Sequence, residues 1–99
     1  MSDFDYQQID DVLHSRIRLT IVAALIGVEG ADFTFLRDKV KTTDGNLSIH
    51  LKKLEDAGYV SSKKRFVDRK PLSTYKITEK GRRALEHYVD TLEKLLKKK

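Results

Sequence analysis

Hydrophobic residues recur at three- and four-residue intervals along much of this 99-residue chain, and this spacing predicts helices. We expect helices over about residues 2–14, 15–27, 34–41, 44–57 and 78–99. In the second stretch almost every position is aliphatic, which predicts a helix buried at the centre of the fold. Side-chain oxygens that can cap the first turns come from Ser2 or Asp3, Ser15, Thr34 and Thr78.

The segment from Asp44 to Ala57 gives the clearest amphipathic pattern. Its leucines, at positions 47, 51 and 54, lie on one narrow stripe that faces a core. The opposite face is polar and basic with one aliphatic residue near its middle, and it comprises Gly45, Asn46, Ser48, Ile49, Lys52 and Lys53. Gly58 follows directly, and a glycine just past a helix end can adopt the left-handed conformation, so the helix is expected to stop there.

Strand-favouring residues follow in two short runs that predict a β-hairpin. The first run extends from Val60 to about Lys64 and the second from Leu72 to Ile77, with a tip over residues 65–70. Pro71 suits the start or the edge of a strand, because it cannot donate to a ladder. A shorter run over residues 31–33 is expected to pair with this hairpin. In the helix over 34–41, we expect Phe35, Leu36 and Val40 to point inward.

Charge is distributed unevenly between the two halves of the chain. The net charge is +5, but residues 1–57 hold seven basic and ten acidic residues, whereas residues 58–99 hold thirteen basic and five acidic ones. A polyanionic partner is therefore indicated, and nucleic acid fits better than a membrane surface because no basic amphipathic helix carries a bulky aromatic face. The absence of cysteine excludes disulfides and thiolate sites, and with no long apolar run or basic leader we expect a cytoplasmic protein.

Three sequence segments resemble the short winged-helix transcriptional regulators related to the ArsR and MarR families. They are NLSIHLKKLEDAGYV, RKPLSTYKITEKGRRAL and, more weakly, RIRLTIVAAL. The resemblance implies an α+β winged helix-turn-helix fold in a single domain over residues 1–99. It also implies a homodimer that binds operator DNA, with residues 1–14 and 79–99 as dimerisation helices around a core of 15–78. Metal sensors of the ArsR type carry ligand sets that this chain lacks.

Two surfaces are candidates for DNA contact. The first is the helix over 44–57, where the candidates are Gly45, Asn46, Ser48, Ile49, His50, Lys52 and Lys53. Asparagine, serine and lysine can reach base edges or phosphates, and isoleucine can contact a thymine methyl group. Glycine lets the helix N-terminus approach a phosphate. His50 has two readings, a phosphate contact or a half-buried side chain. The hairpin cations can follow the backbone or reach a minor groove, and these are Lys63, Lys64, Arg65, Arg69 and Lys70. The alternative for both surfaces is an ordinary solvated face.

A long apolar stripe near the C-terminus indicates a dimer interface. So small a domain is more readily stabilised when this stripe is buried against a second subunit, although packing on the first helix of the same chain is the alternative. The predicted interface residues are Phe4, Ile9, Val12, Leu85, Tyr88, Val89, Leu92, Leu95 and Leu96.

Other functional classes find little support in the residues. His87 and Asp90 have the spacing of half a metal site, but the remaining ligands are missing, so we expect no metal and no cofactor. Ser48 and His50 lie two residues apart on a helix and do not face each other, so we expect no enzyme. The alternative function is a winged helix used as a protein-interaction module in a larger assembly. RNA binding ranks below it, because no aromatic stacking platform is evident.

Overall fold

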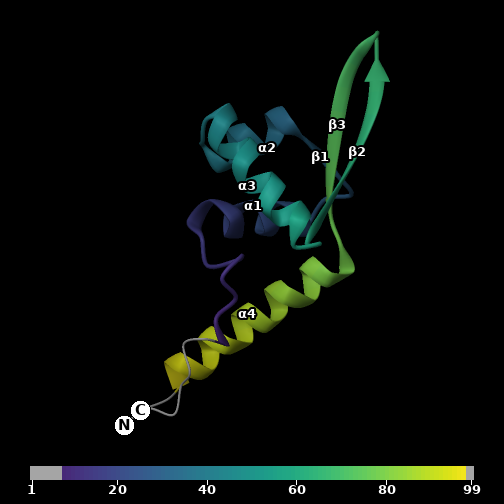
Figure 1. The fold of residues 1–99 in the computed structure, drawn as a ribbon. Coiled ribbons are helices and arrows are strands. Elements are labelled where there is room, and N and C mark those ends of the chain that lie inside the picture. The colour runs from purple at the N-terminus through teal and green to yellow at the C-terminus, as the bar shows by residue number, and fades with distance from the viewer. Residues whose placement is uncertain (1–7, 98–99) are drawn as a thin grey trace.

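The computed structural model describes residues 8–97 and has the predicted α+β architecture (Figure 1). Three helices precede a hairpin and a fourth helix follows it. In chain order the elements are α1 (Arg16–Ile26), β1 (Ala31–Asp32), α2 (Phe33–Val40), α3 (Asp44–Asp56), β2 (Val60–Val67), β3 (Lys70–Ile77) and α4 (Glu79–Lys97). This succession of a helix, a short strand, a helix-turn-helix and a β-hairpin is a winged helix.

The core lies where α1, α2 and α3 meet the base of the sheet. From α1 come Ile21, Val22 and Leu25, all fully buried, which confirms that the nearly all-aliphatic helix is the centre of the fold. The turn before α1, the other helices and the sheet add the remaining buried apolar residues, namely Leu13, Ala31, Leu36, Leu47, Leu51, Leu54, Val60 and Tyr88.

The three strands form an antiparallel sheet in the order β1-β3-β2. The short strand pairs with β3 as predicted, with Ala31 opposite Tyr75. The hairpin strands are longer than predicted, because β2 and β3 remain paired as far as Val67 opposite Lys70. The tip is therefore only Asp68 and Arg69, both with positive φ, which is the conformation that a two-residue hairpin turn requires.

Helix starts are capped by side chains, with one correction to the predicted positions. Ser15 and Thr78 cap α1 and α4 as predicted. The cap of α2 is Asp32, whose carboxylate accepts from the amide of Phe35 at 2.7 Å, so Thr34 lies inside the helix. The prediction that Phe35 points inward is wrong, because its side chain is exposed. The inward face of α2 carries Phe33, Leu36 and Val40 at helical spacing, and of these Leu36 is fully buried.

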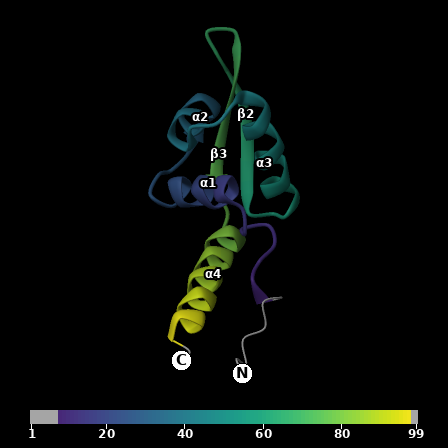
Figure 2. The same cartoon turned by 90° about the vertical axis from the view of Figure 1, so that its left-hand side faces the viewer.

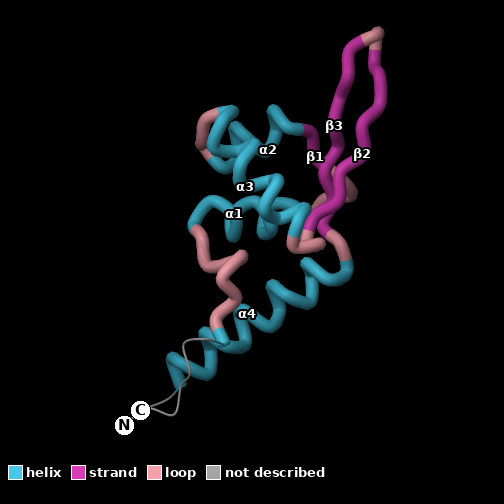
Figure 3. Tube along the Cα trace, in the orientation of Figure 1, coloured by secondary structure: helices cyan, strands magenta, loops and turns pink. Residues whose placement is uncertain are grey.

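In the described part of the segment before α1, the predicted α-helix is not observed. Residues 9–15 form turns and bends, and Figure 3 shows them as a loop that descends from α1 towards α4. The carboxylate of Asp10 accepts from the amides of Val12 and Leu13, and this side-chain bond competes with helical pairing. Leu13 still reaches the core, because the turn places it there without a helix. The predicted start of this helix, including Phe4, lies outside the described residues.

The hairpin and α4 project from opposite ends of the helical core (Figures 1 and 2). The molecule is consequently elongated, with extents of 60 × 25 × 21 Å. At the base of α4, a Cβ atom added to Gly81 would lie 2.2 Å from the carbonyl oxygen of Tyr59, so only glycine permits this close approach. Among the described helices, none is long and apolar enough to cross a membrane.

Candidate nucleic-acid interface

The outward face of α3 is fixed by what the helix buries. Leu47, Leu51 and Leu54 are 0%, 2% and 0% exposed, as the leucine stripe predicts. The face opposite them is solvent-exposed over its whole length, and it carries Gly45, Asn46, Ser48, Ile49, Lys52 and Lys53. The structure therefore brings six of the seven helix candidates together on one surface.

Both ends of α3 are held by hydrogen bonds from backbone amides, to a side chain at the start and to carbonyls at the end. Thr43 caps the start, where its hydroxyl accepts from the amide of Asn46 at 3.2 Å. At the other end Gly58 has a φ of 81°, and the amides of Gly58 and Tyr59 donate to the carbonyls of Glu55 and Leu54. This pair of bonds is a Schellman motif, so the predicted glycine stop is confirmed. The helix thus has a fixed length and a fixed exit towards β2.

Ile49 lies at the centre of the exposed face of α3. Its side chain is 56% exposed although its neighbours on this face are polar or charged. A single exposed isoleucine makes no contribution to the described core, but it offers a contact for an apolar group such as a thymine methyl.

His50 lies at the edge of this face and is partly buried against α1. Its Nδ1 atom lies 2.9 Å from Nη1 of Arg18, and because arginine always donates, Nδ1 is the acceptor. Burial, followed by the nearby charges of Arg18 and Lys53, lowers the pKa of His50 below its ordinary value. The half-buried reading of His50 therefore describes its position, and the phosphate contact, which would use Nε2, stays a prediction.

Arg18 and Tyr59 connect the N-terminal turn to α3 and its exit. Nε of Arg18 donates to the carbonyl oxygen of Val12 at 2.5 Å. The Tyr59 hydroxyl donates to the carboxylate of Asp10, and burial together with this bond raises the pKa of Tyr59 to about 12. The turn over residues 8–15 thus helps to hold the helix that presents the exposed face.

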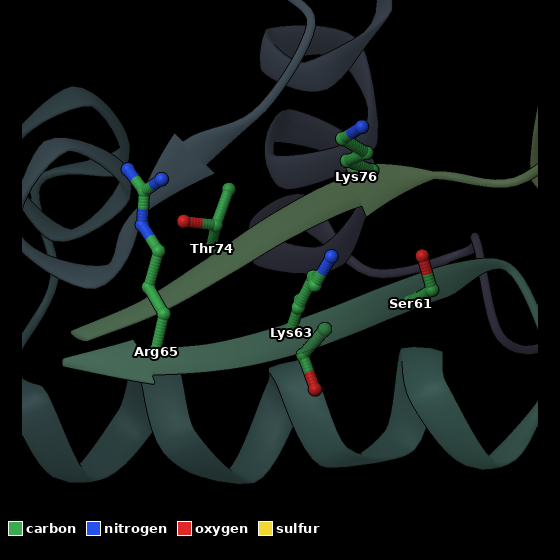
Figure 4. A pocket seen from close by; sticks show the side chains of 6 residues that line it. Ser61, Lys63, Arg65, Thr74 and Lys76 are labelled. Carbon is green, nitrogen blue, oxygen red and sulfur yellow. The ribbon is translucent and has the colours of Figure 1, made fainter. Parts of the chain in front are cut away.

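The wing, residues 60–77, distributes its cations over two faces. Side chains alternate along paired strands, so Lys63 and Arg65 share one face with Thr74 and Lys76 (Figure 4). These side chains line an open groove of about 490 Å³ together with Ser61 and Ser62. Lys64 alternates to the other face, which looks towards α3 because the Ser62 hydroxyl donates to the carboxylate of Glu55 at 2.6 Å.

None of the wing cations takes part in an ion pair within residues 8–97. Their charge is therefore available to a polyanion. All five predicted wing cations are exposed, namely Lys63, Lys64, Arg65, Arg69 and Lys70. Lys76 was not predicted, although the two-residue periodicity and the hairpin register place it on the same face as Lys63 and Arg65.

The apolar stripe of α4 is divided between the chain itself and solvent. Tyr88 is buried, and its hydroxyl lies 3.3 Å from Nδ1 of His14. Leu85 and Leu92 are partly buried, whereas Val89, Leu95 and Leu96 are exposed. A shallow groove of about 330 Å³ runs beside the exposed part, lined by Ile26, Arg82, Leu85, Glu86, Val89 and Asp90. Ile9 and Val12 are partly buried against the core of their own chain.

The described part of the chain contains no cluster of side chains that could bind a metal ion. No group of three or more histidine, aspartate or glutamate side chains comes together there. His87 and Asp90 are both exposed on α4.

Comparisons with known proteins agree with this geometry. A profile of the winged helix DNA-binding domain matches residues 17–96. An uncharacterized protein of Methanocaldococcus jannaschii is 42% identical over 78 residues, which cover 79% of this chain and 85% of the relative. The structure of a transcriptional regulator homologue from Pyrococcus horikoshii superposes with a TM-score of 0.79 at 28% identity, covering 86% of this chain and 84% of that one. The structure of the transcriptional regulator BldR from Sulfolobus solfataricus superposes with a TM-score of 0.69 at 26% identity, covering 83% of this chain and 58% of that one. The chain belongs to the winged helix DNA-binding domain family.

Proposed function

We propose that this chain is a homodimeric transcriptional regulator that binds double-stranded DNA with sequence preference. The observation that carries the proposal is the exposed face of α3, which is backed by three buried leucines and lies beside a wing whose cations have no ion-pair partner among the described residues. The P. horikoshii and S. solfataricus proteins, both transcriptional regulators or homologues of one, support the regulatory role.

In this proposal α3 lies in the major groove. Asn46 reads an adenine edge, Ser48 contacts a base edge of either kind, and Ile49 contacts a thymine methyl group. The remaining helix candidates position the protein on the backbone, and these are Gly45 at the helix N-terminus, Lys52, Lys53 and His50 through Nε2. A salt bridge of 3.6 Å between Lys52 and Asp56 is no obstacle, because so exposed a pair contributes little to stability and exchanges readily for phosphate.

The wing then lies on the flanking backbone or minor groove. Its cations Lys63, Lys64, Arg65, Arg69 and Lys70 supply affinity that depends on salt and not on sequence. A hairpin that enters a groove has a phosphate chain on each side, so cations on both faces of the ribbon find partners. Lys76 joins Lys63 and Arg65 on one of these faces.

A twofold axis would pair the segments that flank the core. We assign residues 1–14 and 79–99 to dimerisation and residues 15–78 to DNA binding. The exposed Val89, Leu95 and Leu96 of α4 are the strongest contributors, because burying them removes apolar surface that the single chain leaves in water. The predicted set also includes Leu85, Leu92, Ile9, Val12 and Phe4. Tyr88, predicted with them, is only 7% exposed in its own chain and therefore has little surface left for a second subunit. Two copies of α3 would then reach successive major grooves about 34 Å apart.

The test is a titration of the purified protein against duplex DNA of random sequence over a salt series, with light scattering to count subunits. We expect a dimer whose log affinity falls steeply with log salt, and selection from a random pool should then yield a near-palindromic site. A monomer that ignores DNA even at low salt would contradict the proposal. The basic wing would then be explained by an acidic protein partner, which is the interaction-module alternative.

A further inference from the structure

Two apolar side chains near the tip of the wing are exposed to solvent. Phe66 is 73% exposed and Val67 is 45% exposed, and neither contributes to the core. Pro71, directly opposite Phe66 in the ladder, is exposed as well. The hairpin ladder does not require aromatic bulk at this place, because the turn at Asp68 and Arg69 already sets the register.

The surroundings of Phe66 are cationic. Lys64 shares its face, Arg65 precedes it in the chain, and Arg69 and Lys70 follow across the turn. The only acidic residue of the tip is Asp68. An aromatic ring among cations without an ion-pair partner suits a ligand that has both negative charge and a flat apolar surface. Duplex DNA, the ligand class of this family, has both, because its phosphates are negatively charged and its base pairs are flat.

The two exposed apolar residues lie on different faces of the ribbon. Phe66 lies with Lys64 on the face that looks towards α3, and Val67 lies with Lys63 and Arg65 on the opposite face. When α3 occupies a major groove, the face that carries Phe66 is therefore the one turned towards the same stretch of DNA.

The dimensions of the hairpin also matter. Two paired strands are about 4.8 Å apart before their side chains are counted, and the minor groove of B-DNA is only about 6 Å wide. A ribbon tip that enters the groove must therefore widen it. Proteins that widen the minor groove often insert an apolar side chain between base steps and bend the duplex.

We propose that Phe66 is a wedge that inserts at a base step of the minor groove flanking the site of α3 and bends the duplex there. This inference rests on the proposed DNA binding. It adds that the wing reads deformability, so sites with a flexible pyrimidine–purine step under the tip should be preferred.

The test compares F66A with V67A, a matched control that removes an exposed apolar side chain from the other face. Both variants should unfold like the parent protein, because neither residue is in the core. Bending is measured by energy transfer between dyes at the ends of a duplex that carries the selected site. We expect F66A to abolish the bend and to lower affinity roughly five- to a hundredfold, with an unchanged slope of log affinity against log salt. V67A should keep the bend and the affinity of the parent protein.

A second variant reports insertion directly. The chain contains no tryptophan, so F66W introduces a single fluorescent indole at the tip. Stacking on bases should quench its emission and protect it from acrylamide when duplex DNA is added.

The outcomes separate this inference from the proposed function. Salt-dependent binding without a bend, or equal effects of F66A and V67A, would overturn the wedge and leave DNA binding intact. Absence of binding by the parent protein at low salt would overturn both. A blue shift of the F66W emission on vesicles with anionic phospholipid, without a response to DNA, would identify the tip as a membrane contact and overturn the wedge.

Discussion

The exposed face of α3 and the wing are supported in opposite ways. α3 lies on three leucines that are almost completely buried, and a threonine cap and a Schellman motif fix its ends. Residues 63–71 of the wing are all exposed, and in the described structure the β2–β3 ladder holds them in place. A helix held this firmly can place side chains against particular base edges, whereas a ribbon without a core is suited to backbone contacts that tolerate small changes of position.

This difference should separate effects on folding from effects on binding. Substitutions behind α3 act on the fold first, substitutions on its outer face act on the choice of sequence, and substitutions of the wing cations act on affinity for every sequence.

The largest effect is expected behind α3. Replacing Leu51 by alanine removes a 2% exposed side chain from the core, and we expect a loss of about 2–5 kcal/mol in the free energy of unfolding. Ile49 is the matched control on the same helix, and its replacement by alanine should change stability by less than about 0.5 kcal/mol. Urea denaturation of both variants measures the difference. Equal losses would mean that the two faces of α3 are not distinguished by packing.

The next effect lies in the wing. Replacing Lys63, Lys64 and Arg65 together by alanine should leave the unfolding transition in place and weaken binding to all duplexes. The slope of log affinity against log salt should fall by up to about 2.7, because each phosphate contact contributes about 0.9. Titrations over a salt series measure this slope.

Two controls sharpen this comparison. A variant with Arg83, Lys94 and Lys97 replaced by alanine removes the same charge from exposed positions of α4 and should change the slope much less. Replacing Asn46 by alanine should instead relax the preference among sequences by about 1–3 kcal/mol with little change of slope. An unchanged slope in the wing variant would remove the wing from the DNA contact.

The two regions also differ in how well the sequence predicts them. The periodicity of the three leucines, the polar residues between them and Gly58 are local signals that all agree, so α3 was predicted with its correct start and exit. The wing contains Lys63, Lys64 and Arg65 in a row, and such a run lacks the apolar alternation by which half-buried strands are found. The continuation of β2 to Val67 and the two-residue turn were therefore missed.

A further error arose where one side chain decides the outcome. Ile9, Val12 and Leu13 have helical spacing, but the Asp10 carboxylate takes the amides of Val12 and Leu13 and favours a turn. The dimer interface on α4 stays a prediction, because periodicity indicates an apolar contact but does not say on which molecule the contact lies. Tyr88 packs inside its own chain, whereas Leu96 remains 76% exposed.

The smallest effect expected is a pH dependence that belongs to α3 and not to the wing. Because the pKa of His50 is lowered in the folded protein, chiefly by burial and then by Arg18, the unfolded chain binds more protons at mildly acidic pH. Stability should therefore be complete above the ordinary histidine pKa of 6.5 and should decline as pH falls from that value towards the lowered pKa.

Replacing His50 by glutamine should remove this decline, because glutamine can accept from Arg18 and does not titrate. Urea denaturation at pH 7.5 and 5.5 measures the decline, and His87→Gln on the exposed surface of α4 is the control that should keep it. If both variants declined like the parent protein, the bond between Arg18 and His50 would not constrain α3. If only His50→Gln lost the pH dependence of stability, the bond between His50 and Arg18 would be a titratable link between α3 and α1. The wing is held by backbone pairing, which does not titrate, so this pH dependence would belong to α3.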